Sequence, residues 1–381
     1  MQRIRPDYYE KFICIADKCP ITCCQEWKIA VDADTNRRWK KILPPEDMAD
    51  KKKNLSAYTM QKGGMRVIGL DENRRCPFLA DSKLCRLVSA YGDKVLSKTC
   101  TDFPREVHIF QTHEEETLMP CCPAVLDLWK EEEIHFPEVS VPRKTNMLLF
   151  QIRQKIIERF QNNQKSVEDS LLETFYVLLE LLKDPISKER IQDYFSEDTL
   201  LQLQAAIDEV ELPVFDTIAE CNELLLDLAV NYRKEGLYRK YLNPVAEQAE
   251  QLFEQYGTEE ILEKWRAFQG KLQSYQKLLH NFLANEVFSD LLVPDGNLKQ
   301  MVIKMQWIAM EYTAIRQSLF LKWLNDGCEE LSYETVRDYV VVITRMMGYD
   351  EEDIYEYLTN SFEALIWDWG YLALIVGKAI V

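Results

Sequence analysis

The stretch CPITCCQEW, residues 19–27, decides how the first part of this chain is organised, because it places three thiols within six residues. A fourth thiol, Cys14, lies just before it, and nine of the eleven cysteines fall in the first 122 residues. The other two, Cys221 and Cys328, stand alone in apolar helical stretches, where a cysteine usually acts as a small buried hydrophobe. The N-terminal thiols therefore need a chemical explanation of their own.

Metal binding explains this density better than disulfides do. Adjacent cysteines need unusual backbone geometry to pair, and disulfides are rare in cytosolic proteins. Thiolates are soft ligands, and four of them satisfy either a tetrahedral zinc ion or an iron–sulfur cubane. The spacing leaves both open, because the chain has neither a Cys-x2-Cys knuckle nor a bacterial ferredoxin run. The thiols form three groups: Cys14, Cys19, Cys23 and Cys24; Cys76, Cys85 and Cys100; Cys121 and Cys122.

Composition limits the classes of protein. A chain of 381 residues with 47% hydrophobic residues is long enough for two domains. No apolar segment approaches the roughly 20 residues that span a bilayer, and the first residues lack the apolar core of a secretion signal, so we expect a cytoplasmic protein without a membrane partner. Residues 1–142 carry 22 Lys and Arg against 23 Asp and Glu, and the rest carries 24 against 40. That balance argues against nucleic acid as a partner.

The pattern of residues predicts a boundary after residue 142. Before it, we expect short segments: a strand at 65–70, a helix at 84–90, a hairpin formed by 106–110 and 117–119 around 113–115, and a helix from Pro123 through Trp129. These turns and loops would be organised by thiols more than by a thick apolar core.

After the boundary, the pattern changes to long helical periodicity. Apolar stripes predict helices within 148–160, from a capping box at Ser166 and Asp169 to Asp184-Pro185, within 247–282, over 298–324, and over 336–347 with Gly348 as the stop. We therefore predict a mainly α protein with a small cysteine-rich N-terminal domain, residues 1–142, that binds a metal or cluster and contains short β segments. Residues 143–381 would form an all-helical domain.

Other catalytic motifs are absent from the sequence. The four histidines form no His-Glu-x2-His motif, and a Gly-x-Gly-x-x-Gly loop and a nucleophile elbow are both missing. Each histidine is most simply a surface or locally bonded residue. His108 and His113 are the best candidates for another role, because they lie near the thiols in sequence.

The cysteine framework resembles a known family. Phe12-x-Cys14-x4-Cys19-x3-Cys23-Cys24-x2-Trp27, then Cys76-Pro77-Phe78-Leu79 with Cys85-Arg86, then Cys100 with Phe103-Pro104-Arg105, then Cys122-Pro123, are similar to the flagellin lysine-N-methylases. The segment LHNFLANEVF, residues 279–288, is similar to these methylases specifically. Two residues depart from the family pattern: Glu26 stands where a small residue is common, and Thr101 where Arg is common.

The resemblance implies an activity and a set of ligands. The activity is transfer of methyl from S-adenosylmethionine to lysine ε-amino groups on flagellin, with a [4Fe-4S] cluster. Asp32 is a candidate proton acceptor only by its place after Trp27, and Cys121 matches no family cysteine. Two other classes stay open: a non-catalytic zinc or iron carrier, and a helical interaction protein with a metal-stapled domain. The thiols that match the family's ligands are Cys14, Cys19, Cys23, Cys24, Cys76, Cys85, Cys100 and Cys122.

Overall fold

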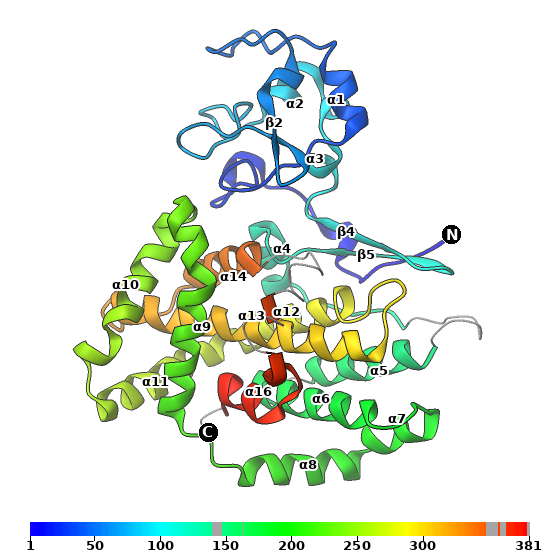
Figure 1. Cartoon of the computed structure of the whole chain (residues 1–381), viewed down its shortest axis with the longest axis vertical. Helices are drawn as coiled ribbons and strands as arrows, with labels where there is room; N and C mark the ends of the chain where they lie inside the picture. Colours follow the sequence, from blue (N-terminus) through cyan, green and yellow to red (C-terminus); the bar gives the residue numbers. More distant parts are fainter. Residues whose placement is uncertain (139–146, 163, 348–356, 359–362, 379–381) are drawn as a thin grey trace.

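The computed structural model describes residues 1–138, 147–162, 164–347, 357–358 and 363–378. Figure 1 shows a small lobe, coloured blue to cyan, above a larger body of helices. The mainly α fold and the helical C-terminal part are therefore confirmed. No helix among the described residues has the length and apolar character needed to cross a membrane.

A three-stranded sheet joins the start of the chain to residues about 110 positions later. Strand β1 (Gln2–Ile4) runs parallel to β5 (His113–Leu118), which pairs antiparallel with β4 (Arg105–Ile109). The predicted hairpin is confirmed, but its turn lies at residues 110–112 and not at 113–115. Helix α4 (Pro123–Glu131) follows the sheet and begins at Pro123, as predicted.

The small lobe is built on a second sheet and short helices. Strands β2 (Thr59–Lys62) and β3 (Met65–Ile68) form a hairpin, which confirms the strand predicted from residue 65. Its two-residue turn is Gly63-Gly64, with φ of 57° and 74°, a conformation in which glycine is favoured at both positions. The helices around it are α1 (Ala33–Trp39), α2 (Arg86–Tyr91) and α3 (Lys98–Asp102).

Helix α13 (Leu298–Asn325) forms the centre of the large body. It is buried along nearly all of its length and contacts α6, α9, α10, α14 and α16. A helix that is buried on all sides must be surrounded by other elements, and polar residues of α13 such as Glu311 and Arg316 are buried with it. The remaining helices are α5 (Met147–Phe160), α6 (Val167–Leu182), α7 (Lys188–Tyr194), α8 (Glu197–Glu209), α9 (Val214–Glu235), α10 (Arg239–Gln255), α11 (Thr258–Leu272), α12 (Gln276–Ser289), α14 (Tyr333–Met347) and α16 (Trp369–Val376).

Most predicted helices are present. Ser166 Oγ accepts the amide hydrogen of Asp169 at the start of α6, as its predicted cap. The helical stretch expected within 247–282 is divided into α10, α11 and α12. The predicted stop at Gly348 lies outside the described residues.

The buried apolar residues form two cores. One lies in the small lobe and contains Trp39, Leu55 and Phe78, while the other fills the large body. Residues near the chain start, such as Tyr8, and residues of α4, such as Trp129, belong to the large core. The chain therefore leaves the large body after residue 21, builds the small lobe, and returns near residue 103. The boundary predicted after residue 142 lies outside the described residues and stays a prediction.

Segment 279–288 ties the N-terminal sheet to the large body. Asn285 of α12 accepts a hydrogen bond from Thr117 Oγ1 at 2.7 Å and donates to the Leu118 carbonyl at 3.2 Å. Asn281, one turn earlier, donates to the Trp129 carbonyl at 3.1 Å. Buried amides need such partners, so both asparagines fix how α12 meets the strands and α4.

Candidate functional site

The thiols meet where the small lobe joins the large body. Seven of them line one cavity of about 570 Å³: Cys14, Cys19, Cys23, Cys24, Cys85, Cys100 and Cys122. Cys76 is buried behind this set, and its backbone amide donates to the Cys24 carbonyl at 2.8 Å. All eight predicted thiols therefore lie in one region, although their role as ligands stays a prediction.

Local backbone pairing brings the first two thiol groups together. The loop at residues 24–26 pairs with residues 74–76, and Gln25 and Arg75 form an isolated bridge. A second bridge joins Leu79 to Cys85, which begins α2. Ser97 caps α3 and thereby positions Cys100 within that short helix.

Burial makes these thiols poor acids. Burial raises the pKa of Cys19 and of Cys100 to about 11, and that of Cys122 to about 12. A hydrogen bond with Cys24, together with burial, raises the pKa of Cys23 well above its ordinary value. These four thiols therefore hold their protons at neutral pH, and a metal that binds them must displace those protons.

Arg345 of α14 connects the large body to the cysteine loop. Its guanidinium donates to the carbonyls of Ile21 and Cys121, both at 3.0 Å, and of Thr22 at 3.3 Å. It also lies 5.0 Å from the centre of the Trp27 ring. Arg345 is 7% exposed, so these contacts are protected from water. Arg345 was not predicted from the sequence, where its signal is a single charge within the apolar run VVVITRMM.

The chemistry of the donor set fits a soft metal group. Seven thiols line the cavity and Cys76 lies beside them, whereas a tetrahedral zinc ion or a cubane cluster needs at most four thiolates. The residues present therefore fit either group.

The role of Asp32 in the structure is to cap a helix, away from the cysteine cavity. It caps α1, where its Oδ1 accepts the Thr35 amide hydrogen at 2.8 Å and its Oδ2 accepts that of Lys98 at 3.1 Å. Partial burial alone would raise the pKa of Asp32, but these hydrogen bonds lower it to about 2. Asp32 does not line the cysteine cavity, so we make no proposal through it.

The structure also shows the surroundings of the remaining cysteines and of His113. Cys121 is buried beside the site and contributes its carbonyl to Arg345. The isolated Cys221 is fully buried within the large core, as expected for a small hydrophobe, whereas Cys328 is half-buried. His113 is buried against Glu115, which is held by Arg153 at 2.6 and 2.7 Å.

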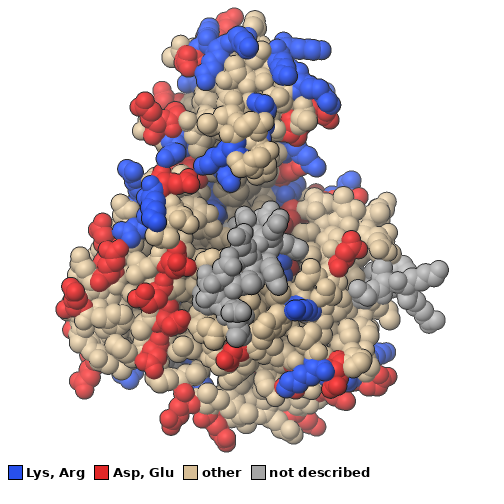
Figure 2. Space-filling model, viewed as in Figure 1, with Lys and Arg blue, Asp and Glu red and all other residues tan. Residues whose placement is uncertain are grey.

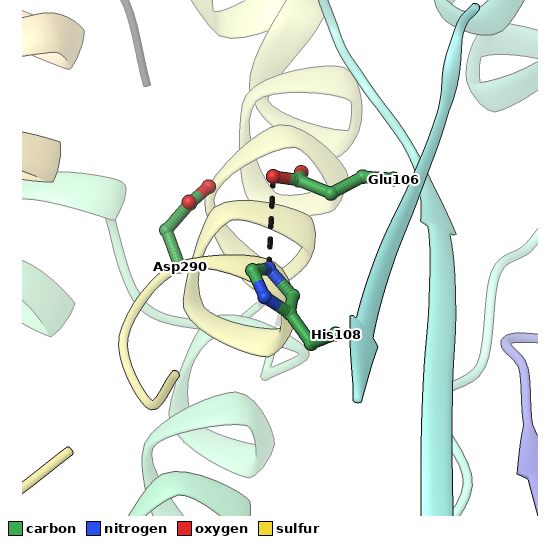
Figure 3. Close-up of side chains that lie close together, drawn as sticks. All are labelled: Glu106, His108 and Asp290. Atoms are coloured by element: carbon green, nitrogen blue, oxygen red, sulfur yellow. Dashed lines mark ion pairs between the residues drawn. The ribbon is translucent and has the colours of Figure 1, made fainter. Parts of the chain in front are cut away.

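His108 lies in a separate polar cluster between β4 and the end of α12. Figure 3 shows its ring beside Glu106 and Asp290, and the three side chains have ligand atoms within 4.8 Å of one another. Glu106 also accepts a hydrogen bond from Ser289 at 2.6 Å. This cluster is partly buried, and none of its three residues lines the cysteine cavity.

Charge is distributed unevenly over the two parts. On the face in Figure 2, Lys and Arg side chains gather over the small lobe, while Asp and Glu side chains are frequent along the helices at the left of the large body. The excess of acidic residues after residue 142 is thus visible on the surface.

A second pocket lies on the other side of Trp27 and Arg345. It has a volume of about 430 Å³, and α9 and the segment that follows it provide one wall, which includes Tyr232 and Tyr238. Glu26 lies on the opposite wall, and its carboxylate accepts the Tyr238 amide hydrogen at 2.8 Å. The sequence analysis did not predict this pocket, because its walls come from residues about 200 positions apart.

Comparison with known proteins gives a consistent family assignment. Residues 147–375 match the family model described as the FliB lysine N-methylase C-terminal domain. The chain is 27% identical over 166 residues to the Lysine-N-methylase of Salmonella typhimurium, and 30% identical over 169 residues to that of Salmonella choleraesuis. Each match covers 41% of this chain and 40% of the relative.

A shorter relative has a flagellar name. The Flagellar biosynthetic protein FliU of Salmonella muenchen is 29% identical over 127 residues, which are 32% of this chain and 72% of that protein. The chain thus matches less than half the length of the two lysine-N-methylases. No solved structure matches the chain.

Proposed function

The chain belongs to the FliB lysine N-methylase family, and from this premise we propose that it methylates lysine ε-amino groups on flagellin. S-Adenosylmethionine is the proposed methyl donor, and the cytoplasm, before export of flagellin, is the proposed place of reaction. The names of the relatives, Lysine-N-methylase and Flagellar biosynthetic protein FliU, support this choice. The observation that carries it is the thiol-lined cavity at the junction with the methylase-type helical body.

We further propose that these thiols hold a [4Fe-4S] cluster. The number of thiols that line the cavity supports a metal group with several thiolate ligands, and the resemblance to the methylases favours the cluster. When bound through three thiolates, such a cluster supplies an iron with an open position for the amino and carboxylate groups of S-adenosylmethionine. The proposed ligands come from the set of Cys14, Cys19, Cys23, Cys24, Cys76, Cys85, Cys100 and Cys122.

The chain's own residues prepare the cavity for methyl transfer. Trp27 and Phe103 meet edge to face at 5.2 Å and form an apolar wall. An apolar wall excludes water, and desolvation favours the neutral form of a lysine, whose ordinary pKa is about 10.4. Arg345 fixes the loop that carries three of the thiols by binding its carbonyls. These residues would orient the reactants and maintain a dry site.

The cofactor is tested by metal analysis of protein purified without oxygen. We expect about four iron and four sulfide per chain, with a broad absorption band that bleaches on reduction. Zinc without sulfide, even after anaerobic reconstitution, would refute the cluster and favour a carrier or a structural metal site.

The activity is tested with purified flagellin and methyl-labelled S-adenosylmethionine. Cluster-loaded protein should label flagellin lysines, as measured by peptide mass spectrometry, and metal-stripped protein should not. Tight binding of flagellin without any labelling would refute the enzyme and favour the interaction protein.

A further inference from the structure

The lining of the cysteine cavity carries more positive than negative charge. Among the described residues, its charged side chains are those of Lys83, Arg105, Arg345 and Asp93. Lys83 and Asp93 are exposed, so water and salt screen them. Arg345 directs its donors to three backbone carbonyls. Arg105 is partly buried, and it is the cation of this cavity whose partner remains to be identified.

The backbone fixes the position of Arg105 at the cavity wall. Arg105 is the first residue of β4 and pairs with Leu118 of β5. Directly before it, the Pro104 carbonyl accepts the amide hydrogen of Met119 at 2.8 Å. Pro104 and Arg105 both line the cavity, so the strand begins at the cavity wall and holds Arg105 there.

Two aromatic rings support the guanidinium of Arg105. Its central carbon lies 5.3 Å from the centre of the Phe12 ring and 5.9 Å from that of the Tyr9 ring. Contact with a ring uses the face of a guanidinium and leaves the N–H groups at its edge for hydrogen bonds. Within the described chain, no oxygen accepts a hydrogen bond or an ion pair from the Arg105 side chain.

A carboxylate in the same sheet is already neutralised by other cations. Glu116 of β5 lies opposite Val107, so it is a diagonal neighbour of Arg105 on the same face of the sheet. Arg5 donates to Glu116 Oε2 at 2.8 and 2.9 Å, and Arg3 Nε lies 3.4 Å from Glu116 Oε1. Arg105 therefore remains available to an acceptor that enters the cavity.

The chemistry of this position suits a carboxylate ligand. A guanidinium presents two parallel N–H groups that match the two oxygens of a carboxylate, and such charge-assisted bonds are strong where water is scarce. The proposed methyl donor has one anionic group, the carboxylate of its methionine part. The cavity, at about 570 Å³, is within the range of about 300–1,000 Å³ that is usual for small-molecule sites.

We propose that Arg105 binds the carboxylate of S-adenosylmethionine and thereby orients the methyl donor in the cysteine cavity. This inference rests on the proposed function and names the residue that recognises the donor. Arg105 acts as a binding and positioning residue, and Phe12 and Tyr9 keep its guanidinium in place.

The test uses S-adenosylmethionine and its decarboxylated form, which lacks only the carboxylate. Isothermal titration calorimetry without oxygen measures the binding of each to the metal-loaded protein. Arg105→Gln should weaken binding of S-adenosylmethionine about ten- to hundred-fold, because it removes hydrogen bonds to a charged group. Binding of the decarboxylated form should stay within about two-fold of the wild type. Arg105→Lys should give an intermediate affinity, because it keeps the charge but not the planar set of donors.

Lys83→Gln is the matched control, because it removes one positive charge from the same lining. Lys83 is exposed, and its ammonium donates to the Cys19 carbonyl at 3.4 Å. Its loss should change the affinity for S-adenosylmethionine by less than about three-fold, because water and salt screen an exposed charge. Iron content should be the same in the wild type and in all three variants.

Three results would overturn the inference. An equal loss of affinity in Lys83→Gln would show a general effect of charge, and an equal loss for both ligands in Arg105→Gln would show a structural role. Loss of iron from Arg105→Gln would assign Arg105 to the metal group. Failure of the proposed function is seen separately, as absence of flagellin labelling by the loaded wild type, because donor binding is measured without flagellin.

Discussion

Arg345→Ala should open the cysteine loop much more than it unfolds the protein. The variant leaves the carbonyls of Ile21, Thr22 and Cys121 without their donor in a region that water reaches poorly. A hydrogen bond to a charged group contributes roughly 1.5–3 kcal/mol, and such contributions are not additive. Allowing for partial relaxation, we expect the free energy of local opening to fall by about 3–5 kcal/mol.

The assay is the rate at which a thiol reagent labels Cys19 and Cys23 in metal-free, reduced protein without denaturant. When opening is fast and reversible, labelling follows the population of the open form. A change of about 3 kcal/mol therefore raises the labelling rate by at least about 100-fold. The labelling rate of Arg345→Lys should lie between those of the wild type and Arg345→Ala, because an ammonium retains the charge but not the planar set of donors of a guanidinium.

Arg337→Ala is the matched control. Arg337 is also on α14 and largely buried, but it binds Asp338 and Asp127, away from the cysteine loop. It should lower the urea midpoint without changing thiol labelling. The reasoning fails if Arg345→Ala labels within five-fold of the wild type, or if Arg337→Ala accelerates labelling equally.

Three further predictions concern the thiols and the buried charges. Cys23→Ala should lose bound metal and methyl transfer together, whereas Cys328→Ser should retain both; metal analysis showing full occupancy in the first variant would contradict the ligand assignment. Burial and the nearby charge of Asp290 raise the pKa of Glu311 from 4.5 to about 8. The folded state therefore holds the Glu311 proton to a higher pH than the unfolded state does, so the free energy of unfolding should fall as pH rises from about 5 to 8. Glu311→Gln should flatten that slope in urea unfolding, and an unchanged slope would refute the assignment. Arg153→Met removes the guanidinium partner of the buried Glu115 carboxylate and should cost about 3–5 kcal/mol at pH 7. This loss of stability should become smaller in acid, where Glu115 takes up a proton; calorimetry at neutral and at acidic pH that shows the same loss would refute this reasoning.

The helical body was predictable because its signals are local. The apolar run of α13 and the cap at Ser166 are recorded within a few residues of sequence. The turn of the hairpin was placed wrongly for the opposite reason. Residues 113–115 look like a polar turn, but Glu115 is buried in β5 because Arg153, 38 positions later, neutralises it.

The candidate site also contains some residues that the sequence predicted and others that it could not predict. Cysteine is rare enough that its clustering predicted which thiols lie together. Arg345 could not be found from the sequence, because its partners are backbone carbonyls more than 220 positions away. The N-cap role of Asp32 could have been anticipated, because the residue directly precedes a helical segment with Thr35 at its third position. The place of Asp32 after Trp27, on which its candidate role as a proton acceptor was based, was a weaker signal than this capping pattern.

The path of the chain into the small lobe and back has a consequence for biosynthesis. The segment with all eight thiols leaves the ribosome before the helical body, and Arg345, which holds the loop at residues 21–22, follows Cys122 by more than 220 residues. At a translation rate of about 5–20 residues per second, that interval is roughly 10–45 s. During this time the nascent thiols lack the helices that bury them, and they are open to oxidants and to competing metals. If the thiols hold the proposed cluster, reducing conditions and iron supply during translation should therefore influence the fraction of active protein.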